Sequence, residues 1–360
     1  MSNSQESVLV YCLQVPIKEA ETVKHDLINS GTFLKNFRLL KERNFIYLPI
    51  NYSEDASYPW PVEQKLLTPL QNKLDYHKAL RAILPSVLHE FIPSSFDRVG
   101  SIILIKLQPE LESYKQVIGT ELLKQFNVQA VFNKIGDVDT KYRTVTWECI
   151  AGNQDPVTIH KMNNLRFKVD VSKVYFNSRL SNEYSRIASL CTDGDKVIDM
   201  FAGVGPFTIL VASQKDVEIF ALDINPAAIH YLNENIVLNR KFLIGKITTS
   251  CGDSKELLKT LPKANKIIMN LPGSAIDFLL PALQHLESNG TIFLHQFVHL
   301  TKEEKKLELD KPLAELTTLI NQLSYQNDLE QTTYTITGNK LRAVSPGKIH
   351  VVWDITKYSR

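Results

Sequence analysis

The sequence has few of the residues that mark a cross-linked or metal-bound protein. Its 360 residues include four cysteines, and no two of them are close in sequence. Cysteine ligands of structural zinc come in closely spaced pairs, and small disulfide scaffolds are much denser in cysteine. The sequence therefore predicts no metal, no disulfide framework and four reduced thiols, Cys12, Cys149, Cys191 and Cys251.

The chain also lacks a strong net charge and a long apolar run. Lys and Arg number 41 against 39 Asp and Glu, so any nucleic-acid footprint must be local. No apolar stretch is long enough to cross a bilayer, and the first residues are polar, unlike a signal peptide. With 44% hydrophobic and 22% charged residues, the composition is typical of a globular protein. We expect a cytoplasmic protein without membrane contact.

The pattern around which the chain is organised is a strand, a glycine turn and a helix. Val197 to Met200 is an apolar run that predicts a buried strand, Ala202 to Gly205 form the turn, and Pro206 opens an apolar helix. Such a turn lets the backbone approach a ligand at a helix start. The third glycine of the dinucleotide fingerprint is absent and Asp199 precedes the turn, which favours a ligand without a pyrophosphate, such as S-adenosylmethionine. An ordinary strand-to-helix turn is the alternative.

Polar residues also end the other predicted strands. Asp223 ends the second strand, Asp253 follows the third, and Asn270 ends a fourth. In an open α/β sheet, ligands bind at the carboxyl ends of the strands. A carboxylate at Asp223 accepts both ribose hydroxyls of an adenosine, and Asp253 accepts from an adenine amino group. Each residue singly fits a cap or a turn, but their order along the chain indicates one site.

These motifs carry a family resemblance. The chain resembles the tRNA (guanine-37-N1)-methyltransferases of archaea and eukaryotes, which use S-adenosylmethionine. The segments that carry the resemblance are Tyr175–Arg186, Asp199–Phe207, Asp223–Pro226 and Asn270–Pro272, and it extends over most of the chain. It implies an α/β protein with a class I S-adenosylmethionine-dependent methyltransferase (Rossmann-like) domain preceded by two smaller α/β domains, a tRNA partner and a monomeric enzyme.

We expect three domains. Residues 1–60 form a small α/β domain, which the resemblance implies contacts the tRNA elbow, and residues 51–70, rich in Ser, Pro and Asp, form a linker. Residues 72–173 form a mixed α/β middle domain that binds tRNA. Residues 174–360 form the methyltransferase domain.

Two details of these domains are predicted from local patterns. In the middle domain, Asn163-Asn164 between two alternating runs predicts a hairpin. In the methyltransferase domain, residues 302–323 predict an amphipathic helix, and the runs 332–337 and 348–355 predict a closing antiparallel pair.

Basic residues gather in the middle domain and just after it. A charged surface is usually only solvated, but beside a catalytic cleft such a face favours phosphate binding. The residues concerned are Lys141, Arg143, Lys161, Arg166, Lys168, Lys173, Arg179 and Arg186.

Methyl transfer to guanine N1 needs a base and a cation, because N1 carries a proton and negative charge develops on O6. The resemblance places a glutamate in the base role, which matches Glu183, and an arginine at O6, which matches Arg143. Arg179, four residues before Glu183, is expected to pair with it on one helical face and set its pKa. The same spacing is also common in purely structural ion pairs.

The remaining site residues follow from the same motifs. Asn270 and Pro272 are expected to bind the guanine edge, since an amide offers both a donor and an acceptor. Tyr175 and Phe176 each stack in or shape the pocket, or are ordinary core aromatics. The expected cofactor contacts are Asp199, Phe201, Gly203, Gly205, Asp223, Ile224, Asp253 and Asn270.

The same motifs bear on four other functions. An amino-group methyltransferase is disfavoured because Leu271 and Gly273 depart from its Asn-Pro-Pro-aromatic motif. Wyosine-pathway relatives transfer an aminocarboxypropyl group or methylate a tricyclic guanine derivative at carbon, and the second of these activities is not excluded. A non-catalytic tRNA-binding protein is disfavoured by the intact Asp199, Asp223, Glu183 and Asn270.

Overall fold

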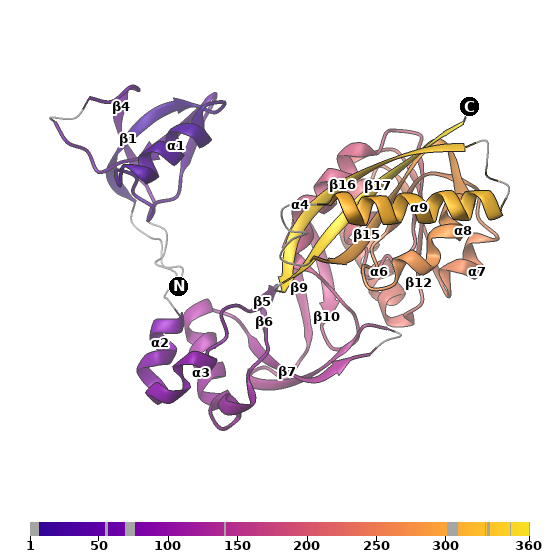
Figure 1. Ribbon diagram of the computed structural model, residues 1–360. Coiled ribbons are helices and arrows are strands. Elements are labelled where there is room, and N and C mark those ends of the chain that lie inside the picture. Colours follow the sequence, from indigo (N-terminus) through magenta and orange to yellow (C-terminus); the bar gives the residue numbers. More distant parts are fainter. Residues whose placement is uncertain are drawn as a thin grey trace. The chain divides into compact units, whose positions relative to one another are not determined.

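The chain forms two compact units, Met1–Glu90 and Phe91–Arg360. Figure 1 shows the computed structural model, which describes residues 7–54, 57–68, 76–139, 142–300, 309–327, 329, 332–345 and 347–359. The division into three domains stays a prediction, and its boundary at residue 72 lies outside the described residues. No helix in the described part of the chain is long and apolar enough to cross a membrane.

The first unit is built on a four-stranded antiparallel sheet in the order β2-β3-β1-β4. Leu13 and Leu48 are fully buried and pack with Leu27 of α1. Its regular elements are β1 (Val8–Pro16), α1 (Ala20–Asn29), β2 (Leu40–Glu42), β3 (Phe45–Pro49), β4 (Val62–Leu67) and α2 (Tyr76–Ile83).

The prediction that residues 51–70 form a linker is wrong, because β4 lies in this stretch and pairs with β1 from Val8↔Leu67 to Leu13↔Val62. β4 is an edge strand with only Leu67 buried. Half-exposed, polar edge strands lack the apolar alternation that identifies inner strands. The sheet of the first unit therefore extends beyond residue 60.

The second unit begins with a mixed sheet in the order β5-β6-β7-β8. Its elements are β5 (Asp97–Val99), β6 (Ile102–Ile105), η2 (Pro109–Tyr114), α3 (Lys115–Phe126), β7 (Ala130–Val138) and β8 (Val145–Gly152), after η1 (Ser86–Phe91). The predicted hairpin is confirmed as β9 (Val157–Met162) and β10 (Leu165–Asp170). Asn163 and Asn164 have φ of 50° and 64°, the left-handed pair that a tight two-residue turn requires.

A seven-stranded sheet forms the rest of the unit, in the order β13-β12-β11-β14-β15-β17-β16. The first five strands are parallel, and β17 and β16 are antiparallel, which confirms the predicted closing pair and the Rossmann-like class. Its elements are η3 (Ser178–Leu180), α4 (Ser181–Leu190), β11 (Lys196–Asp199), α5 (Pro206–Gln214), β12 (Glu218–Asp223), α6 (Pro226–Asn239), β13 (Lys246–Cys251), α7 (Ser254–Leu258), β14 (Ala264–Met269), η4 (Ala275–Phe278), α8 (Leu279–His285), β15 (Leu286–His299), α9 (Asp310–Gln326), β16 (Thr332–Ser345) and β17 (Lys348–Ser359).

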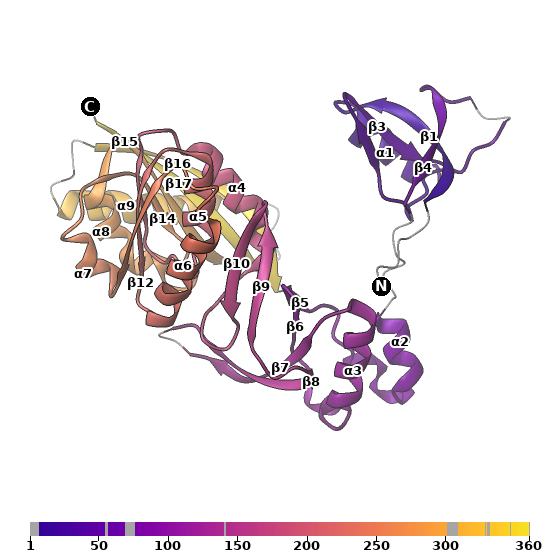
Figure 2. The same cartoon turned by 180° about the vertical axis from the view of Figure 1, so that it is seen from behind.

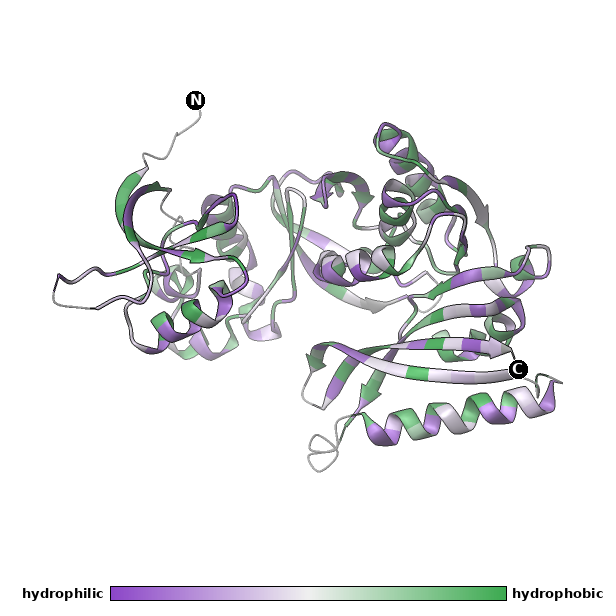
Figure 3. Cartoon of the chain, turned by 90° about the horizontal axis from the view of Figure 1, so that it is seen from above, coloured by the Kyte–Doolittle hydropathy of each residue, from purple (hydrophilic) through white to green (hydrophobic). Residues whose placement is uncertain are grey.

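Helices cover both faces of this sheet, α4, α5 and α6 on one and α7, α8 and α9 on the other (Figure 2). Strand alternation divides the apolar side chains between the faces, as Val197 and Ile198 illustrate. In α9 the buried Leu316 and Ile320 recur every four residues, and the long helix near the C-terminus in Figure 3 mixes apolar and polar residues accordingly. Residues 302–308 of the predicted helix lie outside the described residues.

Two asparagines of α6 attach the β9–β10 hairpin to this sheet. Asn235 accepts a hydrogen bond from the Lys168 N–H and donates to its carbonyl, and Asn239 does the same for Arg166. These side chains replace a neighbouring strand along β10 and satisfy its backbone. The apolar core is also continuous across the predicted boundary at residue 174, from Phe132 through Phe167 to Phe207.

Candidate active site

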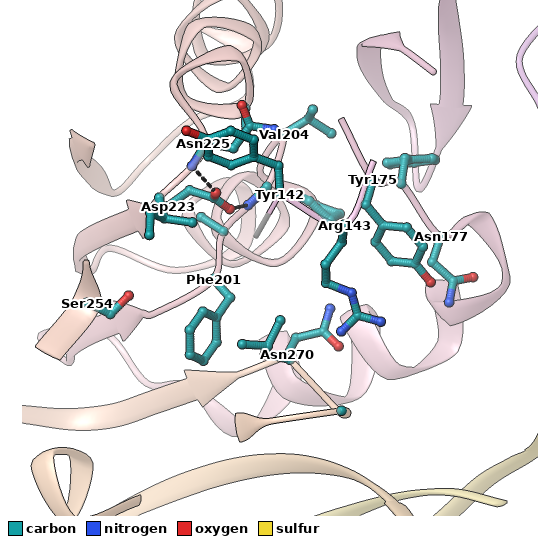
Figure 4. Close-up of a pocket in the computed structure, with 18 of the residues that line it drawn as sticks. Tyr142, Arg143, Tyr175, Asn177, Phe201, Val204, Asp223, Asn225, Ser254 and Asn270 are labelled. Carbon is teal, nitrogen blue, oxygen red and sulfur yellow. Dashed lines mark hydrogen bonds between the residues drawn. The ribbon is translucent and has the colours of Figure 1, made fainter. Parts of the chain in front are cut away.

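A cavity of about 700 Å³ lies at the carboxyl ends of β11, β12 and β14, where the strand order of the sheet reverses. Its size is within the usual range for small-molecule sites. Figure 4 shows side chains from several elements converging on it. The residues expected from the sequence that line it are Arg143, Tyr175, Phe201, Gly203, Asp223, Ile224, Asp253 and Asn270.

Asp223 is held by backbone groups on two sides. Its Oδ2 accepts a hydrogen bond from the Gly203 N–H at 2.8 Å, and its Oδ1 accepts from the Asn225 N–H at 2.9 Å (Figure 4). Burial raises the pKa of Asp223, and these two bonds oppose that effect. The carboxylate therefore has a fixed orientation, with lone pairs left for ligand hydroxyls.

The side of the cavity around Asp223 fits an adenosine-containing cofactor. Gly203 has φ of 57°, and an added Cβ would meet only the Tyr175 carbonyl oxygen, at 3.8 Å, so there is open space beside the turn. Phe201, packed edge-on against Phe278 with centroids 5.0 Å apart, and Ile224 supply apolar surface for a base. Together with the Asp223 carboxylate, these groups match a ribose and an adenine.

Asp253 both lines the cavity and caps α7, since its Oδ1 accepts from the Lys255 N–H.

Among the described residues, no group of three or more His, Cys, Asp or Glu side chains is arranged to hold a metal. The four cysteines are free.

Two expected cofactor contacts, Asp199 and Gly205, do not line the cavity. Asp199 is fully buried and accepts a hydrogen bond from Thr208 Oγ1, and burial raises its pKa to about 7. Gly205 has φ of 89°, and an added Cβ would lie 2.3 Å from Leu232 Cδ1. Both residues support the turn from behind, and glycine at 205 is required by packing rather than by a ligand.

The other side of the cavity carries Arg143, Tyr175 and Asn270. The Arg143 guanidinium lies over the Tyr175 ring, 5.4 Å from its centroid, and extends toward Asn270 in Figure 4. An added Cβ at Gly273 would lie 4.0 Å from Arg143 Nη1, so the arginine lies beside the loop after β14. Pro272 does not line the cavity, and its carbonyl accepts from the Phe297 N–H at 2.9 Å.

The expected pair between Arg179 and Glu183 is wrong. Arg179 pairs with Asp97 and donates to the Phe96 carbonyl, because η3 ends before α4 begins and turns Arg179 away. Glu183 pairs instead with Arg186, three residues later. Glu183 is only 3% exposed and does not line the cavity, although the next residue, Tyr184, does.

The basic face is smaller than the sequence suggested. Lys168 pairs with Glu234 and Lys173 with Asp170, and Arg179 and Arg186 are paired as described. Lys161 and Arg166 are both exposed and lie directly opposite each other in the β9–β10 hairpin. Lys141 lies outside the described residues.

Several cavity residues were not identified from the sequence. They come from loops and helix starts without a periodic pattern, and Asp139, for example, accepts from the Tyr142 N–H in the turn between β7 and β8. The additional residues are Asp139, Tyr142, Asn177, Tyr184, Ala202, Val204, Pro206, Asn225, Ala228, Ser254, Leu271, Gly273, Ser274 and Phe278, whereas Phe176 lines the cavity as expected.

Three family profiles match successive parts of the chain. The TRM5/TYW2 methyltransferase domain matches residues 158–327, the TYW2 N-terminal domain residues 76–155, and the tRNA methyltransferase 5 N-terminal domain residues 12–57. Trm5b of Pyrococcus abyssi, a tRNA (guanine(37)-N1)-methyltransferase, is 37% identical over 290 residues, covering 80% of this chain and 84% of its own.

Solved structures are similar over nearly the whole chain. The crystal structure of that Trm5b superposes with a TM-score of 0.68, 32% identity and coverage of 97% and 99% of the two chains. A complex of aTrm5 with tRNALeu has a TM-score of 0.65, 28% identity and coverage of 96% and 99%. Trm5 of Methanocaldococcus jannaschii in complex with adenosine has a TM-score of 0.63, 28% identity and coverage of 97% and 100%.

Proposed function

This chain belongs to the tRNA (guanine(37)-N1)-methyltransferase family, and we propose on that basis that it transfers a methyl group from S-adenosylmethionine to N1 of guanosine 37 in tRNA. The observation that carries the proposal is the cavity itself. It joins an adenosine-compatible wall around Asp223 to a wall where Arg143 and Asn270 converge. The relatives with tRNA and with adenosine bound support both ligand classes.

Bound S-adenosylmethionine supplies an electrophilic methyl group on a sulfonium, whose C–S bond electrons stay on sulfur when the methyl is transferred. Asp223 would accept hydrogen bonds from the ribose hydroxyls, and Phe201 and Ile224 would flank the adenine. Asp253, exposed at the start of α7, would accept from the adenine amino group while it keeps its cap. These residues would hold the nucleoside part of the cofactor on the Asp223 side of the cavity, opposite the wall that carries Arg143 and Asn270.

Two side chains recognise and polarise the guanine. Asn270 offers an amide donor and acceptor to the N1–O6 edge of a base flipped out of the anticodon loop. The Arg143 guanidinium lies beside the protein loop that follows β14 and carries Asn270. It holds the negative charge that develops on O6 as N1 loses its proton. Tyr175 keeps Arg143 in place through its ring face. Pro272 shapes the loop through its bond with Phe297.

Glu183 is the proposed base that receives the N1 proton. Its support is the match to the family's glutamate and its position next to Tyr184, which lines the cavity. Burial raises its pKa, so it is a stronger base than an exposed glutamate, and the attraction of Arg186 opposes this shift. In the described state Arg186 binds the carboxylate behind the cavity wall. Catalytic contacts often tighten only in the substrate complex, so guanine must reach the carboxylate or the side chain must turn toward it.

The rest of the chain binds the tRNA body. Lys161 and Arg166 contact phosphates, and the first unit contacts the tRNA elbow, as the family resemblance implies. The profile matches at residues 12–57 and 76–155 support a small N-terminal domain and a middle domain in addition to the methyltransferase domain. We expect the enzyme to act as a cytoplasmic monomer, which size-exclusion chromatography and fractionation will test.

The test uses purified protein, labelled cofactor and tRNA transcripts that carry guanosine or adenosine at position 37. We expect label only in the guanosine transcript, in a nucleoside identified by mass spectrometry as 1-methylguanosine. An aminocarboxypropyl product assigns the wyosine branch instead. Binding of tRNA without any modified nucleoside assigns the non-catalytic alternative.

A further inference from the structure

Arg186 is bound on both edges of its guanidinium by two carboxylates from distant parts of the chain. Its Nε and Nη2 donate to Glu183 Oε2 and Oε1, each at 2.8 Å. Its Nη1 and Nη2 donate to Asp354 Oδ2 and Oδ1, at 2.6 and 2.9 Å. Glu183 and Arg186 share one turn of α4, whereas Asp354 lies 168 residues further on, in β17.

Asp354 occupies a position where the fold favours an apolar residue. It pairs across the sheet with Phe293 on β15, and Val352, two residues before it, belongs to the core on the same face. A carboxylate there costs free energy unless it is paired. Apolar replacements of buried ion pairs are often neutral or stabilising, so stability alone gives no reason for Asp354.

Glu183 does not need Asp354 for its own hydrogen bonds, since Arg186 alone satisfies both oxygens. What Asp354 adds is a second anchor for a long side chain with many rotamers. It also adds a second negative charge, so that the three groups carry a net negative charge instead of forming a neutral pair.

We propose, resting on the function proposed above, that Asp354 is a positioning residue for methyl transfer: through Arg186 it fixes the orientation of the Glu183 carboxylate and keeps that carboxylate from being neutralised by its arginine.

The electrostatic surroundings support this role. Burial is the main reason that the pKa of Glu183 is raised, Arg186 opposes this, and the charge of Asp354 raises it further. Outside the three groups themselves, the ionisable side chain that interacts with Arg186 is His295 on β15. His295 stays neutral, because burial lowers its pKa well below the ordinary value. α5, the helix beside α4, carries no ionisable side chain.

The test is single-turnover methyl transfer as a function of pH with wild type, Asp354→Asn, Glu183→Gln and the double variant. Asp354→Asn is expected to slow transfer roughly ten- to hundredfold, the range for a misplaced catalytic group, and to move the acidic limb of the profile to lower pH. In the Glu183→Gln background, Asp354→Asn should cause no further loss of rate, because the effects of substituting residues that act as a unit are not additive. Glu148→Gln is the matched control, since it removes one carboxylate from the ion pair with Lys115, away from the cavity lining.

An unmoved acidic limb, or a full additional loss in the Glu183→Gln background, overturns the inference and leaves the proposed function intact. Should Asp354→Asn not fold, Asp354→Glu carries the test: it keeps the charge but displaces the carboxylate, so the rate falls while the limb stays. An unchanged rate in Asp354→Glu overturns the proposal.

If wild type transfers no methyl group to any transcript, the proposed function fails and the inference is decided separately. The Glu183 carboxyl is then titrated by ¹³C NMR, with its signal assigned by its loss in Glu183→Gln. A lower pKa in Asp354→Asn than in wild type supports the coupling, and equal values overturn it.

Discussion

The Asp223 carboxylate accepts a hydrogen bond from the Gly203 N–H at 2.8 Å, so the end of β12 is tied to the glycine turn that follows β11. The residues are 20 positions apart, and both line the cavity. The glycine turn therefore orients a carboxylate as well as leaving room for a ligand. Loss of the carboxylate affects both the cofactor contact and the turn that shapes its site.

Asp223→Ala is expected to weaken S-adenosylmethionine binding by about 1.5–3 kcal/mol, the contribution of a hydrogen bond to a charged group. Isothermal titration calorimetry measures the change, and circular dichroism checks the fold. Glu218→Gln is the matched control, since Glu218 is exposed at the opposite end of the same strand. Equal affinity in Asp223→Ala and wild type would contradict the assignment of Asp223 to the ribose.

Asp199→Asn is expected to change the pH dependence of stability and to leave cofactor affinity unchanged. The folded-state pKa of Asp199 is about 7, above its ordinary value of 3.8. Its contribution to stability is therefore fully present below the unfolded pKa and is lost as the pH rises through about 7. The melting temperature of the variant relative to wild type should increase between about pH 4 and pH 7, the interval between the unfolded and folded pKa values over which this stability is lost. A constant difference across this range would show that Asp199 does not titrate there.

Glu183→Gln is expected to slow single-turnover methyl transfer by about 10²–10⁴-fold, because the amide cannot accept the N1 proton. Affinities for cofactor and tRNA should change little. The wild-type rate should fall on the acidic side as Glu183 is protonated, at a pH above the range of an ordinary glutamate, since burial raises its pKa. A near wild-type single-turnover rate in the variant would limit Glu183 to a structural pair with Arg186.

Replacing Lys161 and Arg166 by alanine is expected to weaken tRNA binding and to reduce its salt dependence. The slope of the logarithm of the binding constant against the logarithm of the salt concentration should fall by about one unit for each phosphate that the variant no longer binds. The two like charges face each other across the hairpin, an arrangement that is unfavourable without an anion. Lys115→Ala is the control, because Lys115 is already paired with Glu112 and Glu148. An unchanged slope in the double variant would show that the hairpin does not bind tRNA.

Removing residues 1–68 is expected to leave the second unit folded and to weaken binding of full-length tRNA. An anticodon stem-loop, which has no elbow, should bind equally well with or without these residues. Removing only residues 1–60 leaves β4 without its partner β1, and this variant should aggregate more readily because an unpaired strand invites association. Equal affinity for full-length tRNA after removal of residues 1–68 would contradict the elbow contact.

Much of the fold was determined by local sequence pattern. The apolar strands β11, β12 and β14 are recognisable because parallel strands are buried on both faces, and Pro206 and Gly205 mark the start of α5. The Asn163-Asn164 turn was predictable because asparagine tolerates positive φ. β4 was missed for the opposite reason, since an edge strand with one buried residue carries almost no apolar pattern.

The cavity edge was equally predictable from the sequence, because the ends of parallel strands meet at one edge whatever else the chain does. Asp223 and Asn270 were identified in this way. The side-chain partners were not, since helical spacing makes Arg179 as good a neighbour for Glu183 as Arg186 is. Only the tertiary structure brings Asp97 to Arg179 across 82 residues and Asp354 to Arg186 across 168. The positions of strand ends follow from local backbone geometry. The partner in an ion pair depends on which distant carboxylate the packing of the whole domain brings close to the arginine.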